Sequence, residues 1–163
     1  MIKRSRIKQN LKELLPNLRE IFKSQEGLIA AYLFGSYAKG TPGPLSDIDI
    51  AYLLDESMYK EKAEELGASL YLSVSSCLQT DEISFICLNE APLSARYAVI
   101  STGKVLFSSD DSQRVEFEER TLKMYIDTQH IRQEYFDYLF KKIKEDNFGY
   151  RYKQNKKPAK SIR

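Results

Sequence analysis

Residues 33–50 read LFGSYAKGTPGPLSDIDI, and this stretch decides the fold class of the chain. It overlaps an uninterrupted apolar run, residues 28–34, which stops at Gly35 as a buried strand does at its end. Ser36 is placed to cap a short helical turn that Gly40 would end. Backbone N–H groups left free at the start of such a turn bind phosphate, so we expect a phosphate-binding turn directly after the first strand.

Two aspartates follow Ser36 after ten intervening residues, at the start of a second expected strand. Residues two apart on a strand point to the same face, so we expect the carboxylates of Asp47 and Asp49 to converge while Ile48 faces the core. Two close carboxylates repel each other unless a cation joins them. Mg²⁺ takes one or two carboxylates together with phosphates and water. A phosphate-binding turn beside such a pair indicates nucleotidyl transfer.

The rest of the chain alternates between helical and strand patterns, which predicts the α/β class. Helices are expected over residues 1–25, with a break near residue 15 because Pro16 interrupts the pattern. Further helices are expected over 58–78, 91–101 and 115–144, and further strands over 82–88 and 105–107. The later-helix residues expected in the core are Leu66, Leu70, Leu72, Val74, Leu122, Ile126, Tyr135, Tyr138 and Leu139.

Composition excludes several classes of protein. Two cysteines and one histidine, His130, are too few for a disulfide scaffold or a Cys/His zinc site. The longest uncharged apolar run has seven residues, far short of a membrane span, and no secretory signal follows the N-terminus. We therefore expect a cytoplasmic protein with one domain over residues 1–146, whose parts are N-terminal helices (1–25), a catalytic α/β core (28–107) and a C-terminal helix (112–146).

A basic tail, residues 147–163, is expected to follow this domain. Residues 141–163 contain nine lysines and arginines against two acidic residues, with Phe148, Tyr150 and Tyr152 among them. This composition suits contact with nucleic acid or an acidic partner, and equally a solvated terminus. Net charge alone does not make the chain a nucleic-acid binder, so nucleic acid is not an expected partner. The C-terminal helix is expected to act either as a lid over the sheet or as a partner surface.

The Gly-Ser pair, ten residues and Asp-x-Asp resemble the signature of the DNA polymerase beta-like nucleotidyltransferase superfamily. The flanking residues 31–40 and 46–50 resemble its minimal branch, the MNT proteins. Residues 88–92, 100–107 and 117–127 are similar to the MNT antitoxins that are paired with HEPN ribonuclease toxins. The resemblance implies a small mixed sheet flanked by helices, with a long C-terminal helix. It also implies Mg²⁺-dependent transfer of AMP from ATP to a tyrosine of the HEPN toxin.

The resemblance assigns roles to individual residues. Asp47 and Asp49 would be catalytic and would hold the metal ion, while Gly35 and Ser36 would bind the nucleotide phosphates. Lys39 would either contact these phosphates or solvate the loop.

A third acidic residue of the family falls on Ser84 in this chain. Glu82, two residues earlier on the same strand face, is the candidate for that third carboxylate and for a third metal ligand. Because of Ser84, one alternative is a catalytically impaired MNT protein that neutralises its toxin by binding alone. Another is an adenylyltransferase for a small molecule such as an aminoglycoside, although a single short domain leaves little chain to build an acceptor pocket.

Overall fold

The computed structural model describes residues 11–145. These residues fall into two units, one ending at Tyr125 and one beginning at Ile126. The helices and strands are, in chain order, α1 (Leu11–Ser24), β1 (Leu28–Phe34), α2 (Gly35–Lys39), β2 (Ile48–Leu54), α3 (Glu56–Leu78), β3 (Ile83–Cys87), α4 (Leu93–Thr102), β4 (Lys104–Ser108), α5 (Asp111–Asp127) and α6 (Gln129–Lys144). None of these helices is both long and apolar enough to cross a membrane.

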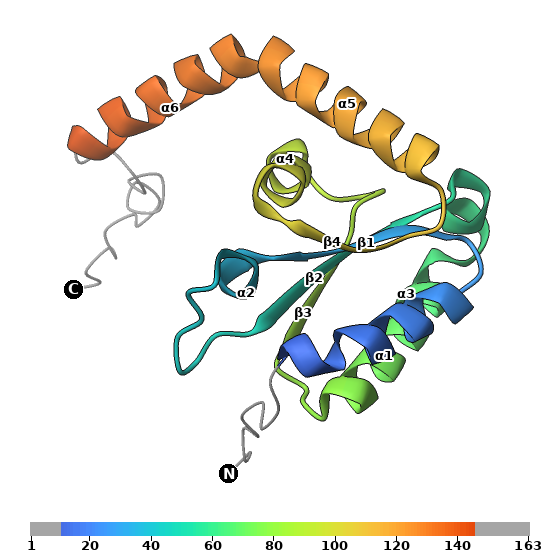
Figure 1. Cartoon of the computed structure of the whole chain (residues 1–163). Coiled ribbons are helices and arrows are strands. Elements are labelled where there is room, and N and C mark those ends of the chain that lie inside the picture. Colours follow the sequence, from blue (N-terminus) through green and yellow to red (C-terminus); the bar gives the residue numbers. More distant parts are fainter. Residues whose placement is uncertain (1–10, 146–163) are drawn as a thin grey trace, which may run out of the picture. The chain divides into compact units, whose positions relative to one another are not determined.

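The first unit is built on a four-stranded sheet with the strand order β3-β2-β1-β4. Strand β1 pairs antiparallel with β2 and with β4, whereas β2 and β3 run parallel, so the sheet is mixed as expected. Helices α1 and α3 cover one face, and α4 and the first-unit part of α5 lie over the other (Figure 1). The uninterrupted apolar sequence of β1 follows from this arrangement, because a central strand with helices on both faces buries its side chains, here all but that of Phe34 at its end.

Each face of the sheet has its own hydrophobic core. The first contains Leu18 and Phe22 from α1, and Leu70 and Val74 from α3, packed against alternate strand residues such as Ile50. The core on the opposite face contains Tyr32, Leu53, Val99 and Phe117. The alternation along β2 therefore assigns Ile48 and Ile50 to the α1/α3 face, and the odd-numbered residues to the α4 face.

Two expectations about the helices of the first unit are wrong. Helix α1 continues through Pro16 without a break. The amide that this proline lacks would have bonded to the carbonyl of residue 12, so only one bond near the start of the described helix is lost. In α3, which has a kink at Lys62, Leu72 is 67% exposed. Leu70 and Val74 form one buried stripe four residues apart, and Leu72 lies two residues from each, on the opposite side of the helix.

The single C-terminal helix expected over 112–146 is instead two helices, α5 and α6, which are separated at Thr128. Helix α5 buries a stripe formed by Phe117 and Thr121, four residues apart. Four residues that were expected in the core are exposed. Two of them, Leu122 and Ile126, lie on α5 away from that stripe. The other two, Tyr135 and Tyr138, lie on α6, where no residue is buried. Leu139 is half-buried. The predicted basic tail, 147–163, lies outside the described residues.

Candidate active site

The turn from β1 into α2 lies directly against Asp49. Gly35 has a φ of 68°, in the left-handed region that favours glycine. A Cβ built on Gly35 would overlap the carboxylate of Asp49 and would lie 2.8 Å from its Cγ. Only a residue without a side chain lets the backbone approach the carboxylate this closely, which explains the glycine at this position.

The predicted alternation is confirmed at Ile48 and Asp49, the first two residues of β2. Ile48 is completely buried, while Asp47 is exposed just before β2 and Asp49 is half-buried. Burial raises the pKa of the Asp49 carboxyl above its usual range, and the negative charge of Asp47 raises this pKa further. Asp49 therefore lies on the α4 face of the sheet, with Asp47 near enough for its charge to act on the Asp49 carboxyl.

Ser84 sits beside Asp49 in the sheet. The two residues are directly paired across the parallel strands β2 and β3, so their side chains point to the same face. The Ser84 hydroxyl donates a hydrogen bond to the Asp49 carboxylate, and this bond lowers the pKa of Asp49 against the effect of burial. The position at which a third acidic residue was expected therefore lies next to Asp49, and it is occupied by Ser84, whose hydroxyl is uncharged.

Glu82 lies one residue pair further along, beside Asp47. Its carbonyl accepts a hydrogen bond of 3.0 Å from the Ile48 N–H, and Ile48 is paired with Ile83. Within residues 11–145, no three carboxylate, histidine or cysteine side chains are gathered to hold one metal ion. Glu82 is thus not gathered with both aspartates into a three-ligand site, and its role as a third metal ligand stays a prediction.

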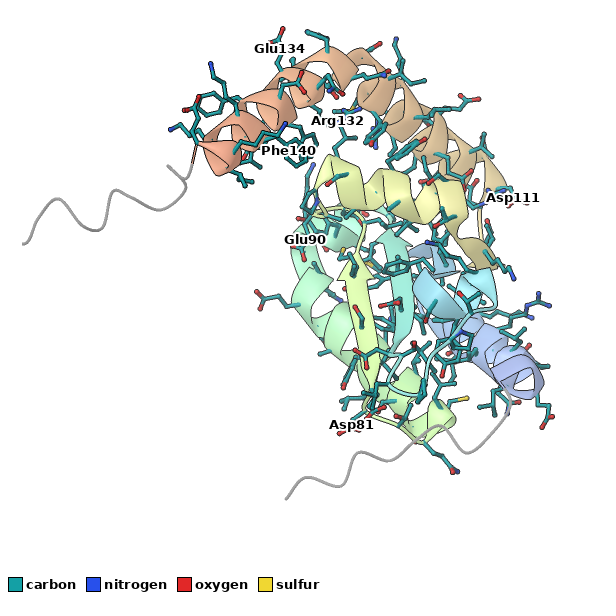
Figure 2. All side chains as sticks on the ribbon, turned by 90° about the vertical axis from the view of Figure 1, so that its left-hand side faces the viewer. Asp81, Glu90, Asp111, Arg132, Glu134 and Phe140 are labelled. Atoms are coloured by element: carbon teal, nitrogen blue, oxygen red, sulfur yellow. The ribbon has the colours of Figure 1, made fainter. Side chains whose placement is uncertain are left out.

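A hollow of about 340 Å³ opens beside Asp47, and the sequence alone did not reveal it. Its lining residues come from the loop before β2 and from the start of β3: Leu45, Asp47, Asp81, Glu82 and Ile83. Figure 2 shows Asp81 at the end of the sheet where β3 begins. The sequence signal that could have pointed to this hollow is an apolar residue, Leu45, within the proline- and glycine-rich loop.

The turn that is expected to bind phosphate differs in one detail from the prediction. Helix α2 begins at Gly35 with Phe34 as its N-cap, and no side chain makes a capping hydrogen bond, so Ser36 does not cap the helix. The backbone carbonyl of Ser36 accepts a 3.0 Å bond from Thr41 N–H, which closes the turn. Lys39 is exposed at the last position of α2.

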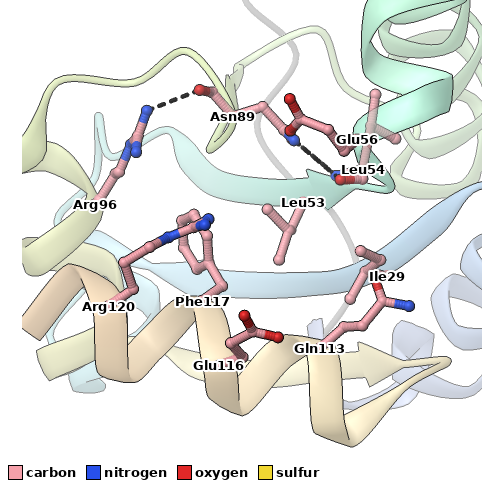
Figure 3. A pocket seen from close by; sticks show the side chains of 10 residues that line it. All are labelled: Ile29, Leu53, Leu54, Glu56, Asn89, Arg96, Gln113, Glu116, Phe117 and Arg120. Carbon is pink, nitrogen blue, oxygen red and sulfur yellow. Dashed lines mark hydrogen bonds between the residues drawn. The ribbon is translucent and has the colours of Figure 1, made fainter.

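A second cavity of similar volume lies at the opposite end of β2, away from the aspartates (Figure 3). Two of its polar side chains are used to hold the fold together. Asn89 bonds to both the N–H and the carbonyl of Leu54, each at 2.9 Å, and Arg96 donates to the carbonyls of Asn89 and Ala91 at 2.7 Å. These bonds tie the end of β2 to the segment before α4, so the polar lining has a structural role.

Comparison with known proteins agrees with this geometry. Residues 16–112 match the family described as "Polymerase beta, Nucleotidyltransferase". The chain is 33% identical to the protein adenylyltransferase MntA of Shewanella oneidensis over 106 residues, which are 65% of this chain and 72% of that protein. Nucleotidyltransferases of this kind generally use a divalent metal ion and ATP.

Two solved structures extend the similarity over most of the chain. A toxin–antitoxin crystal structure with AMP-PNP is 27% identical with a TM-score of 0.65, and the match covers 77% of this chain and 98% of that one. An MNT antitoxin in complex with the tri-AMPylated HEPN toxin of Shewanella oneidensis has a TM-score of 0.63 at 23% identity, over 80% of this chain and 99% of that one. This chain therefore belongs to the polymerase beta nucleotidyltransferase family and is a homologue of the protein adenylyltransferase MntA.

Proposed function

We propose that this chain transfers AMP from ATP to a tyrosine hydroxyl of a HEPN-type toxin and acts in this way as its antitoxin. The observation that supports the proposal is the close approach of Asp49 to the Gly35 turn, with the charge of Asp47 nearby, in a homologue of a protein adenylyltransferase. A cytoplasmic location stays a prediction.

The two aspartates suit a divalent cation. Both are hard oxygen donors on one face, and Mg²⁺ accepts one or two carboxylates while keeping water and substrate phosphates as its other ligands. When bound there, Mg²⁺ would neutralise negative charge on the phosphates. With two carboxylates gathered, the protein's share of the ligands is Asp47 and Asp49, and Glu82 adds a negative charge from β3.

The turn after β1 holds the nucleotide. The backbone N–H groups at Gly35 and Ser36 bind the triphosphate, and the Lys39 ammonium supplies a mobile positive charge next to it. An acceptor oxygen attacks the α-phosphorus, the bond from that phosphorus to the β-phosphate oxygen breaks, and pyrophosphate leaves. Positioning and charge neutralisation supply most of the rate enhancement in phosphoryl transfer of this kind.

A second candidate function is neutralisation of the toxin by binding alone. The observation that favours it is Ser84, which places a hydroxyl beside Asp49 where the expected third acid would stand. Such a protein would still fold around the aspartate pair and would bind Mg·ATP without turning it over.

The test uses the purified chain, Mg²⁺ and the HEPN protein of the same organism, with ATP labelled on either the α- or the γ-phosphate. Transfer predicts label on the HEPN protein from the α position only, lost in Asp47→Asn and kept in Glu64→Gln, an exposed carboxylate on α3. Label from neither nucleotide, with the HEPN protein still bound, would replace transfer with neutralisation by binding.

A further inference from the structure

The strand order gives the aspartate pair two different neighbours. Strand β2 lies between β1 and β3, so the Gly35 turn is on one side of Asp47 and Asp49, and the start of β3 is on the other. The hollow of about 340 Å³ is on the β3 side, with Asp81 and Glu82 in its lining.

In-line displacement requires the acceptor and the leaving group to lie on different sides of the aspartate pair. The nucleophile and the leaving pyrophosphate stand on opposite sides of the α-phosphorus during the transfer. In the proposed function the triphosphate is held by the turn after β1, so pyrophosphate leaves on that side. The acceptor must then approach from the β3 side, where the hollow opens beside Asp47.

We propose that this hollow is the acceptor subsite and that Leu45 contacts the ring of the acceptor tyrosine; the inference rests on the proposed AMP transfer. Leu45 is 75% exposed, which leaves its side chain available to a docking protein. Its position is held by a turn in which Ser46 N–H donates to the Gly43 carbonyl at 3.2 Å and Gly43 N–H donates to the Ser46 hydroxyl at 2.8 Å.

The size and lining of the hollow suit a single aromatic side chain that bears a hydroxyl. Ligand pockets in proteins span roughly 300–1,000 Å³, so this hollow is at the small end and admits a side chain rather than a second nucleotide. A phenol ring would cover the apolar side chain of Leu45 while its oxygen reaches the edge near Asp47. A serine or threonine would bring a hydroxyl with almost no apolar surface to cover Leu45.

The transfer needs no reactant other than ATP and the acceptor tyrosine. The phenolic oxygen forms a bond to the α-phosphorus as the bond from that phosphorus to the β-phosphate oxygen breaks. Pyrophosphate leaves toward the Gly35 turn, and the phenolic proton passes to water in the open hollow. The product is a phosphodiester between AMP and the tyrosine.

The test compares Leu45→Ala with Leu72→Ala, which removes a leucine of similar exposure from α3 that does not line the hollow. Steady-state AMP transfer from ATP to the HEPN protein is measured while each substrate is varied. We expect Leu45→Ala to raise KM for the HEPN protein about tenfold, which corresponds to about 1.4 kcal/mol, with KM for ATP unchanged. We expect Leu72→Ala to match the wild type in both constants.

Equal KM for the HEPN protein in the two variants would overturn the acceptor subsite, and so would a change confined to KM for ATP. Either result leaves the transfer reaction itself intact. Absence of labelled HEPN protein with the wild-type chain would instead overturn the proposed function, and the subsite with it. Binding of AMP-PNP by Leu45→Ala, measured by calorimetry, checks that the variant is folded.

Discussion

Replacing Gly35 by alanine separates the cost of backbone strain from the cost of displacing Asp49. An alanine at φ 68° is strained by roughly 1–2 kcal/mol, and the stiffer unfolded chain offsets about 0.4–1 kcal/mol of this. We therefore expect Gly35→Ala to lower the free energy of unfolding by about 1 kcal/mol. For a chain of this length that lowers Tm by roughly 2–4 °C, measurable by differential scanning fluorimetry.

The effect on activity should be much larger. The new Cβ would lie 2.8 Å from Asp49 Cγ, whereas ordinary contacts begin near 3.4 Å, so the carboxylate must move by more than half an ångström. Misplacement of a reacting group by about 1 Å costs on the order of 100-fold in rate. We expect the rate of AMP transfer to fall about 100-fold.

Gly40→Ala is the matched control for this substitution. Gly40 has a φ of 75° and ends the same short helix, yet a Cβ there meets nothing within 4 Å. This variant should lose the same stability as Gly35→Ala and keep its transfer rate. Equal losses of rate in the two variants would mean that backbone strain alone explains the loss, and not the displacement of Asp49. Full activity of Gly35→Ala would also contradict the predicted displacement of Asp49.

Three further predictions concern stability. Burial raises the pKa of the Asp49 carboxyl, so the ionised carboxylate destabilises the fold above the ordinary carboxyl pKa of about 4. Asp49→Asn should therefore raise Tm at pH 7 and leave Tm unchanged near pH 3. The same substitution should abolish AMP transfer. Burial also raises the pKa of the Tyr32 phenol, which donates a 2.9 Å hydrogen bond to Glu118. The free energy of unfolding should therefore fall as the pH rises above about 10. Urea titrations should show a smaller fall for Tyr32→Phe. Asn89→Ala removes both bonds to Leu54 and should cost about 2–3 kcal/mol in urea denaturation, whereas an unchanged midpoint would mean that water replaces the amide.

Local patterns in the sequence were sufficient for the fold class and for the aspartate pair. The apolar run of β1, the proline-rich loop and the alternation of Asp47-Ile48-Asp49 each report on a few neighbouring residues. Chain geometry converts such patterns directly into a strand, a loop and a shared face. The resemblance, and not a local pattern, singled out Ser84, which the structure pairs with Asp49 across β2 and β3.

Local patterns failed where burial depends on another element. Leu72 has the same apolar character as Leu70, but only the position of α3 against the sheet decides which of them is covered. The exposed apolar residues of α5 and α6 were assigned to a core for the same reason.

The sequence by itself determined the class of chemistry, because Gly35, Ser36, Asp47 and Asp49 lie within fifteen residues of one another, between the end of one strand and the start of the next. Only the tertiary structure decided what surrounds that pair. The parallel pairing of β2 with β3 brings Ser84 to Asp49 and places the start of β3 beside the hollow next to Asp47. Strand pairing joins segments more than thirty residues apart, and no local pattern in either segment specifies the register in which they meet.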